Sequence, residues 1–242
     1  MAFKVEFFTD FKYCLVSVCA NMRFREDVYL AITGLISVIA SYYALFLTPA
    51  DVEMGELVRI FYFHLPPAIM CYLALLVSVA AGLLYLRTKN INYDAASESG
   101  ALLGIVYGLV TLIGGAVWAN ATWGVYWNWD PRETTTLILW FAYLGYFLLR
   151  MSIENPERRA SSAAVFNVMA FLTVPLSYLS FILWPSLHPR LSEDGGLGLT
   201  SSMVQALVMN IVAGLFIFGY LLKKTYERRL KIIVLDSMRE GR

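Results

Sequence analysis

The sequence predicts an all-α integral membrane protein, a single bundle of six transmembrane helices with both termini in the cytoplasm. Hydrophobic residues make up 59% of the 242 residues, and charged residues make up only 15%. Soluble domains carry roughly 25% charged residues. The apolar residues also form long uninterrupted blocks, and the basic residues gather in alternate connections between these blocks. A soluble all-α protein with unusually apolar helices is the alternative that these features disfavour.

Six apolar blocks are candidate spans, and most contain no acidic or basic side chain. They cover residues 28–47, 61–86, 100–118, 134–150, 160–184 and 203–222. A helix of about 20 residues crosses about 30 Å of hydrocarbon. Lipid cannot hydrogen-bond a bare backbone, so we expect each span to be helical.

Two local signals refine these spans. The run Asp130-Pro131-Arg132-Glu133 predicts a helix start, with the aspartate as N-cap and the proline at the first helical position. Pro175 lies inside the fifth block, where a proline removes a backbone hydrogen bond and kinks a helix.

The basic residues predict the orientation. Sixteen Lys and Arg residues fall before the first span, after the last span and in two connections on the same side, whereas Arg59, Arg132 and Arg190 are the only three on the other side. Basic connections stay in the cytoplasm. We therefore expect a multi-pass protein of the inner (cytoplasmic) membrane whose functional face is the outer, periplasmic side.

The chain is expected to form one membrane domain, residues 1–242, with three segments outside the lipid. These are a cytoplasmic N-terminal segment (1–27), an external Trp-rich loop (119–133) and a basic cytoplasmic tail (223–242) beside the lipid bilayer. The net charge of +1 indicates no nucleic-acid partner. The three cysteines have no metal-binding spacing.

Unusual residues concentrate on the predicted outer side. His64, in RIFYFHLPPAI, lies at the outer mouth of the second span, and His188, in WPSLHPRL, follows the outer end of the fifth. They are the two histidines of the chain. The loop between the third and fourth spans contains WGVYWNWDPRETT, residues 123–135. The topology rests on Lys and Arg alone, so this coincidence on one face indicates a functional site.

The tryptophans of this region predict an aromatic surface. Trp118, Trp123, Trp127 and Trp129 cluster here. If residues 123–130 are extended, the last three rings project to one side; if they are helical, Trp123 and Trp127 share a face. An interfacial belt of Trp and Tyr is the alternative, although a belt would be spread over the loops of both sides.

An aromatic surface, two imidazoles and a few arginines suit haem, a flat apolar macrocycle with an iron that takes axial histidine. His64 and His188 are the candidate metal ligands. The outer arginines, Arg59, Arg132 and Arg190, are candidates for pairing the propionates. We find no set of residues typical of a nucleophilic enzyme and no Walker sequence for ATP, so the sequence favours binding and transfer over catalysis.

These motifs resemble a known family. WGVYWNWDPRETT is similar to the tryptophan-rich WWD signature, roughly WGxxWxWDxR, of haem-handling proteins in cytochrome c biogenesis (system I). TPADVEMGELVRIFYFHLPPAI resembles the segment that contains the first external histidine of the CcmC family, and His188 falls where that family has its second. By motif the resemblance covers residues 48–200.

The resemblance implies a function and partners. CcmC proteins hold haem b at the outer face of the cytoplasmic membrane and present it to the haem chaperone CcmE. They associate with the ABC transporter subunits CcmA and CcmB and with the small subunit CcmD. Carried over, His64 and His188 are axial ligands of the haem iron, and Trp123, Trp127, Trp129 and Asp130 form the motif platform. Other interpretations remain open: a bis-histidine haem b electron carrier, a short component of a CcsA-type haem lyase, or a membrane acyltransferase.

Overall fold

The computed structural model describes residues 25–52, 54–188 and 199–239, and all its regular elements are helices. Six helices are long and apolar enough to cross a membrane, so the predicted all-α membrane fold is confirmed. The expected N-terminal segment 1–27 lies outside the described residues except for its last three, and Arg190 lies outside them entirely.

The six candidate spans comprise a first helix, Arg25–Leu47, and the elements that follow it. The first helix ends in a π-helical turn, η1 (Tyr43–Leu47). The next spans are α2 (Val58–Thr88), α3 (Ile91–Trp123) and α4 (Pro131–Ser152), followed by one span divided into α5 (Pro156–Phe171) and α6 (Thr173–Leu183), and by α7 (Ser201–Arg239).

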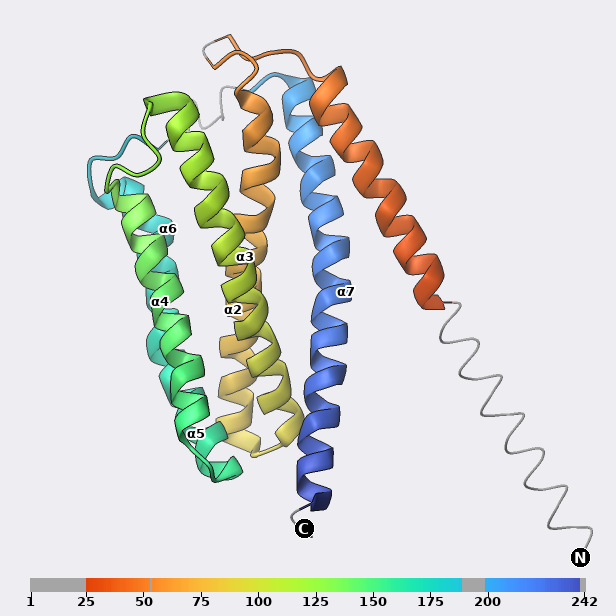
Figure 1. Ribbon diagram of the computed structural model, residues 1–242, viewed down its shortest axis with the longest axis vertical. Coiled ribbons are helices and arrows are strands. Elements are labelled where there is room, and N and C mark those ends of the chain that lie inside the picture. The colour runs from red at the N-terminus through yellow and green to blue at the C-terminus, as the bar shows by residue number, and fades with distance from the viewer. Residues whose placement is uncertain (1–24, 53, 189–198, 240–242) are drawn as a thin grey trace, which may run out of the picture.

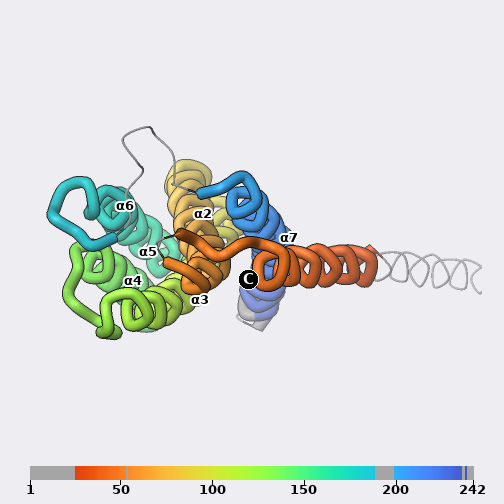
Figure 2. Tube along the Cα trace, turned by 90° about the horizontal axis from the view of Figure 1, so that it is seen from above, coloured from red at the N-terminus to blue at the C-terminus, as the bar shows by residue number. Residues whose placement is uncertain are grey.

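Helices α2 and α3 form the centre of the bundle (Figure 1). On one side they contact α7, and the first helix lies beyond α7; on the other side are α4, α5 and α6 (Figure 2). We call the end that carries the connection between α3 and α4 the site end. The opposite end, which carries the C-terminus, is the terminus end.

Small residues allow α2 and α3 to approach closely. A Cβ at Gly100 of α3 would lie 2.7 Å from the backbone oxygen of Ala74 on α2, and one at Gly104 would lie 2.1 Å from Leu75 Cδ2. Because lipid tails are as apolar as the side chains, such close packing is what holds membrane helices together.

The division between α5 and α6 confirms the predicted kink. Pro175 has no N–H to donate to the carbonyl of Phe171, four residues earlier. The helix breaks at that point: α5 ends at Phe171 and α6 begins at Thr173.

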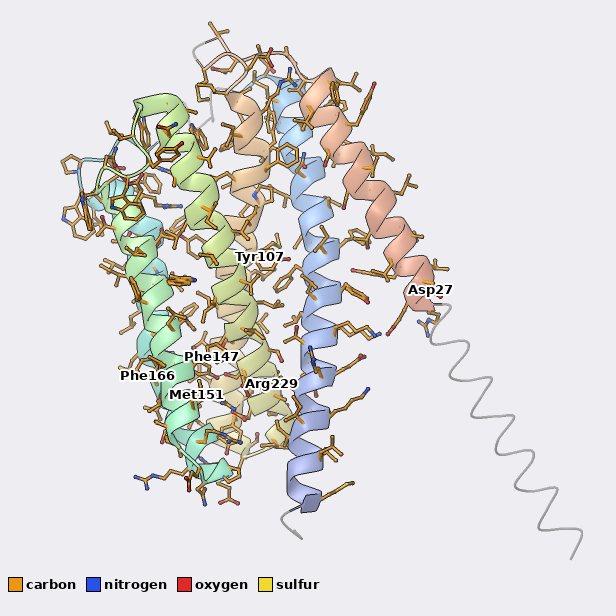
Figure 3. The ribbon with its side chains drawn as sticks, in the orientation of Figure 1. Asp27, Tyr107, Phe147, Met151, Phe166 and Arg229 are labelled. Atoms are coloured by element: carbon orange, nitrogen blue, oxygen red, sulfur yellow. The ribbon has the colours of Figure 1, made fainter. Side chains whose placement is uncertain are left out.

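Helices α3 and α7 extend beyond their apolar blocks at the terminus end, where charged residues are paired inside the bundle. Arg150 donates to both carboxylate oxygens of Asp94, at 2.7 and 2.9 Å, and to Glu98 at 2.8 Å. The other oxygen of Glu98 pairs with Arg229 of α7, labelled in Figure 3. Residues that would otherwise require water thus remain inside the bundle.

Two buried asparagines make interhelical hydrogen bonds. Asn167 of α5 donates to Ser78 of α2 at 2.8 Å and to Ser97 of α3 at 3.1 Å. Asn210 of α7 donates to the carbonyl of Ala40 in the first helix at 3.3 Å. Each such bond is worth about 0.6–2 kcal/mol in a membrane protein.

The buried ion pairs predict that removing Arg150, the cation they share, lowers the free energy of unfolding by a large amount. Replacing Arg150 with Gln leaves two carboxylates without their main partner, and breaking a buried pair costs about 3–5 kcal/mol. We expect a clearly lowered thermal unfolding temperature in detergent. Arg158→Gln is the matched control because Arg158 is exposed near the same end. Equal stability of the two variants would contradict this role for Arg150.

Candidate functional site

A cavity opens among the helices at the site end. The empty space, including its mouth and the solvent in it, is about 780 Å³. Its walls come from α2, α3, α4 and the segment that follows α6. They are lined by Phe61, His64, Leu65, Ala68, Tyr72, Thr111, Leu112, Gly115, Ala116, Trp118, Ala119, Trp123, Trp127, Arg132, Glu133, Thr136 and His188.

His64 projects from α2 against two glycines of α3. A Cβ at Gly114 would lie 3.2 Å from Nδ1 of His64, and one at Gly115 would lie 3.2 Å from Cε1. The ring meets Trp118 edge to face, with 5.7 Å between centroids. Nδ1 is buried and has no hydrogen-bond partner within the described part of the chain, so this imidazole is held by packing.

Two prolines follow His64 directly in α2, at positions 66 and 67. Neither can donate a backbone hydrogen bond, so the carbonyls of Tyr62 and Phe63 lack their usual helical partners. The turn of α2 that carries His64 therefore has two fewer backbone hydrogen bonds than the rest of this 31-residue helix would have.

His188 comes from the irregular segment after α6, which hydrogen bonds hold in place. Its backbone N–H donates to Ser186 Oγ at 3.0 Å. Burial and, after it, the nearby positive charge of Arg132 lower the pKa of His188 to about 4. At neutral pH the imidazole is uncharged, which is the form that binds a metal.

Asp130 connects the loop after α3 with the segment that carries His188. It caps α4 as predicted, since Oδ1 accepts from the N–H of Arg132 at 2.8 Å. Its two oxygens also accept from Ser186 Oγ at 2.9 and 2.8 Å, and Oδ2 accepts from the N–H of Leu187 at 2.8 Å. The residue is only 6% exposed, so one carboxylate positions both segments.

The tryptophans divide into two groups. Trp118, Trp123 and Trp127 line the cavity. Trp129 does not; it is 72% exposed and meets Trp127 edge to face at 5.8 Å. Its φ of 62° is uncommon for a bulky residue.

The connection itself is neither extended nor helical throughout. Helix α3 continues to Trp123, Gly124 adopts a left-handed conformation, and the irregular part ends where α4 begins at Pro131. The irregular stretch is therefore shorter than the expected 119–133.

The structure brings one of the candidate arginines into the cavity wall. Arg132 lines the cavity, donates through Nη1 to the carbonyl of Tyr178 at 2.8 Å, and lies 5.0 Å from the ring centroid of Phe181. Arg59 does not line the cavity; it pairs with Glu56 and donates to the carbonyl of Ala44 at 3.0 Å, which ties the first helix to α2.

The sequence reasoning missed three features of the site. The first is the pair Gly114 and Gly115, whose only signal was that two glycines are adjacent in an apolar span. The second is Ser186, to which no sequence pattern assigned a role. The third is Glu133, whose Oε2 accepts from the N–H of Asn128 at 3.2 Å, while Oε1 is buried without a partner among the described residues.

These features fit a flat apolar ligand that carries a metal able to bind imidazole nitrogens. Aromatic rings form most of the wall, two imidazoles from distant segments reach the same space, and one guanidinium lies beside them. Nδ1 of His64 has no hydrogen-bond partner among the described residues, and the missing Cβ atoms of Gly114 and Gly115 leave room for the ring against α3.

Comparisons with known proteins agree with this chemistry. The family model described as heme exporter protein C matches residues 16–239. Heme exporter protein C of Rhodobacter capsulatus is 34% identical over 196 residues, which cover 78% of this chain and 81% of the relative. The protein of the same name from Bradyrhizobium diazoefficiens is 30% identical over 192 residues, covering 78% and 73%. The match extends over nearly every described helix, and the chain therefore belongs to the heme exporter protein C (CcmC) family.

Proposed function

We propose that this protein binds haem b in the cavity at the site end, with His64 and His188 as the two axial ligands, and presents it for cytochrome c maturation. One observation carries the proposal: two imidazoles from distant parts of the chain line one aromatic cavity. The names of the relatives, heme exporter protein C, support the choice of haem over other flat ligands.

The residues of the cavity have separate roles in this proposal. Haem supplies an iron that accepts two nitrogen ligands in addition to those of the porphyrin. Trp118, Trp123 and Trp127 pack against the macrocycle, and Arg132 is the candidate for pairing a propionate. Arg59 and Trp129 lie outside the cavity wall, and we assign them no contact with the ring.

The proposed orientation places the site end on the periplasmic side of the inner membrane. It rests on the excess of basic residues in the connections at the other end. The haem chaperone CcmE would then receive haem from the periplasm, while CcmA, CcmB and CcmD are the proposed companions within the membrane complex. Trp129, exposed beside the cavity, is available to such a partner.

Transfer in this proposal depends on position rather than on a reacting side chain. The cavity holds its ligand close to a mouth at the end of the bundle, so that one edge of the macrocycle can be reached. Any rate enhancement would come from orientation. A haem b electron carrier is the second candidate, because two histidines line one cavity; turnover of quinone without haem transfer would favour it.

The histidine ligands predict a spectroscopic change. His64→Ala and His188→Ala should each convert bound haem from a six-coordinate towards a five-coordinate absorption spectrum, because each removes one axial nitrogen. Added imidazole should restore the six-coordinate spectrum by entering the space left by the side chain. Unchanged spectra in both variants would rule out axial ligation by these residues.

The tryptophans predict different losses. Trp123→Ala or Trp127→Ala should weaken haem retention by about tenfold or less, since aromatic packing contributes about 0.5–1.5 kcal/mol beyond area burial. Trp129→Ala should retain haem and lose transfer to the chaperone. Trp184→Ala, which removes another exposed ring near the mouth, is the control. If Trp129→Ala lost haem while Trp123→Ala and Trp127→Ala retained it, the proposed roles of these tryptophans would be wrong.

Because Asp130 and Ser186 hold the segment that carries His188, we predict that mutating either of them moves His188 away from its ligand position. Ser186→Ala removes the hydroxyl that bonds both Asp130 and the backbone of His188 but leaves the cap of α4 intact. We expect a spectrum like that of His188→Ala with little loss of stability. Asp130→Ala should give the same spectrum and also cost about 0.5–2 kcal/mol of stability from the lost cap. A normal spectrum in both variants would contradict the link.

A further inference from the structure

A second opening lies at the other end of the first helix, between it and α7. The first helix leans away from α7 towards Arg25 (Figure 1), and it lies outside the rest of the bundle in the perpendicular view (Figure 2). The empty space between the two is about 970 Å³, and it is lined by Arg25, Glu26, Tyr29, Gly219, Tyr220 and Lys223. None of these residues belongs to the cavity that contains the histidines.

The residues that line this crevice carry one excess positive charge, since Arg25 and Lys223 are cations and Glu26 is an anion. Lys223 contacts Glu26 at 3.3 Å, and Lys224, beside the crevice, contacts both oxygens of Glu26 at 2.6 Å. Glu227 lies 3.7 Å from Lys223 and 3.6 Å from Lys224. Lys224, Glu227 and the exposed Asp27, which is labelled in Figure 3, do not line the crevice.

The two basic residues that line the crevice lie at the same depth. Arg25 is 22 residues from Leu47, where the first helix ends, and Lys223 is 22 residues from Ser201, where α7 begins. At about 1.5 Å per residue, both lie about 33 Å from the other end of their helices. This length matches the thickness of the hydrocarbon, about 30 Å, so the crevice lies at the level of lipid headgroups.

A separate apolar groove lies closer to the middle of the bundle, between the first helix, α2, α3 and α7. It has about 570 Å³ of empty space and is lined by Ser37, Ser41, Tyr62, Phe63, Pro66, Pro67, Met70, Tyr107, Asn210, Ala213, Gly214 and Ile217. In the first helix Arg25, Tyr29, Ser37 and Ser41 are four or eight positions apart, and in α7 Asn210, Ala213, Ile217, Tyr220 and Lys223 are three or four apart, so each set shares a helix face.

One side chain stands between the crevice and the groove. The hydroxyl of Tyr29 donates to the carbonyl of Phe216 at 2.7 Å, and the ring stacks on Tyr220 at 6.2 Å between centroids. This aromatic pair forms an apolar wall between the charged end and the groove.

We propose that the crevice binds the phosphodiester of an anionic phospholipid in the leaflet at the terminus end, with one acyl chain passing the Tyr29 ring into the groove. A single phosphodiester charge would balance the excess cation, and a basic crevice between spans is the usual site for such headgroups. The lipid would fill the space where the first helix diverges and fix it against α7. This site does not depend on the ligand bound at the site end.

Thermal unfolding of the purified full-length protein tests the site. The protein is unfolded in detergent with dioleoylphosphatidylglycerol or with dioleoylphosphatidylcholine, which has the same chains and no net charge. We expect the anionic lipid to raise the unfolding temperature by a few degrees more than the neutral one, because a ligand of the folded state stabilises it. The double variant Arg25→Gln/Lys223→Gln should lose this difference.

The matched control is Arg228→Gln/Lys231→Gln, which removes the same charge from exposed positions of α7 outside the crevice. It should retain the difference; equal losses in the two double variants would show only general attraction to the anionic surface and overturn the proposal. An absence of any preference in the unmodified protein would also overturn it. Glycerol 3-phosphate tests a free-anion site: if it stabilises the protein as well as the lipid does, the acyl chain contributes nothing and the lipid assignment is wrong.

Discussion

The arrangement of the proposed haem site depends on the buried carboxylate of Asp130. This side chain caps α4 and at the same time accepts hydrogen bonds from Ser186 and Leu187. The loop with the tryptophans and the segment with His188 are irregular, and neither has a backbone ladder of its own to define its position. Because a single acceptor serves both, the aromatic wall and the second imidazole are placed relative to each other and to the rigid helix α4.

Helix α4 is also fixed at its other end, where Arg150 is buried against Asp94 and Glu98 of α3. A helix held by charged contacts at both termini cannot slide or rotate against α3 without exposing a charge to lipid, which is expensive. Motion at the site is therefore expected in the short segments attached to α4 rather than in the helix. The same reasoning explains how a site with irregular walls can persist at the end of an all-helical bundle.

The sequence predicted what depends on local pattern. The apolar blocks gave the spans, Asp130-Pro131 gave the start of α4, and Pro175 gave the break between α5 and α6. It failed where a residue's partner is remote in the chain. The pairing of Asp94, which lies outside the apolar blocks, with Arg150, the last residue of the fourth block, had no local signal because the two are 56 positions apart. Similarly, no local pattern shows that Trp129 lies outside the cavity, since its positive φ is not a feature that the residue type predicts.

The environment of His64 bears on whether the protein keeps or releases its ligand. Histidines that hold a metal permanently usually donate their second ring nitrogen to a carbonyl or carboxylate, which raises their basicity and strengthens the bond. Nδ1 of His64 is buried with no such partner among the described residues and faces the glycine surface of α3 instead. If this ring binds iron through its other nitrogen, as we propose, it is oriented by packing and does not gain this added basicity. A ligand that is well placed but weakly basic suits a protein that passes haem on, whereas a resident electron carrier would benefit from the stronger bond.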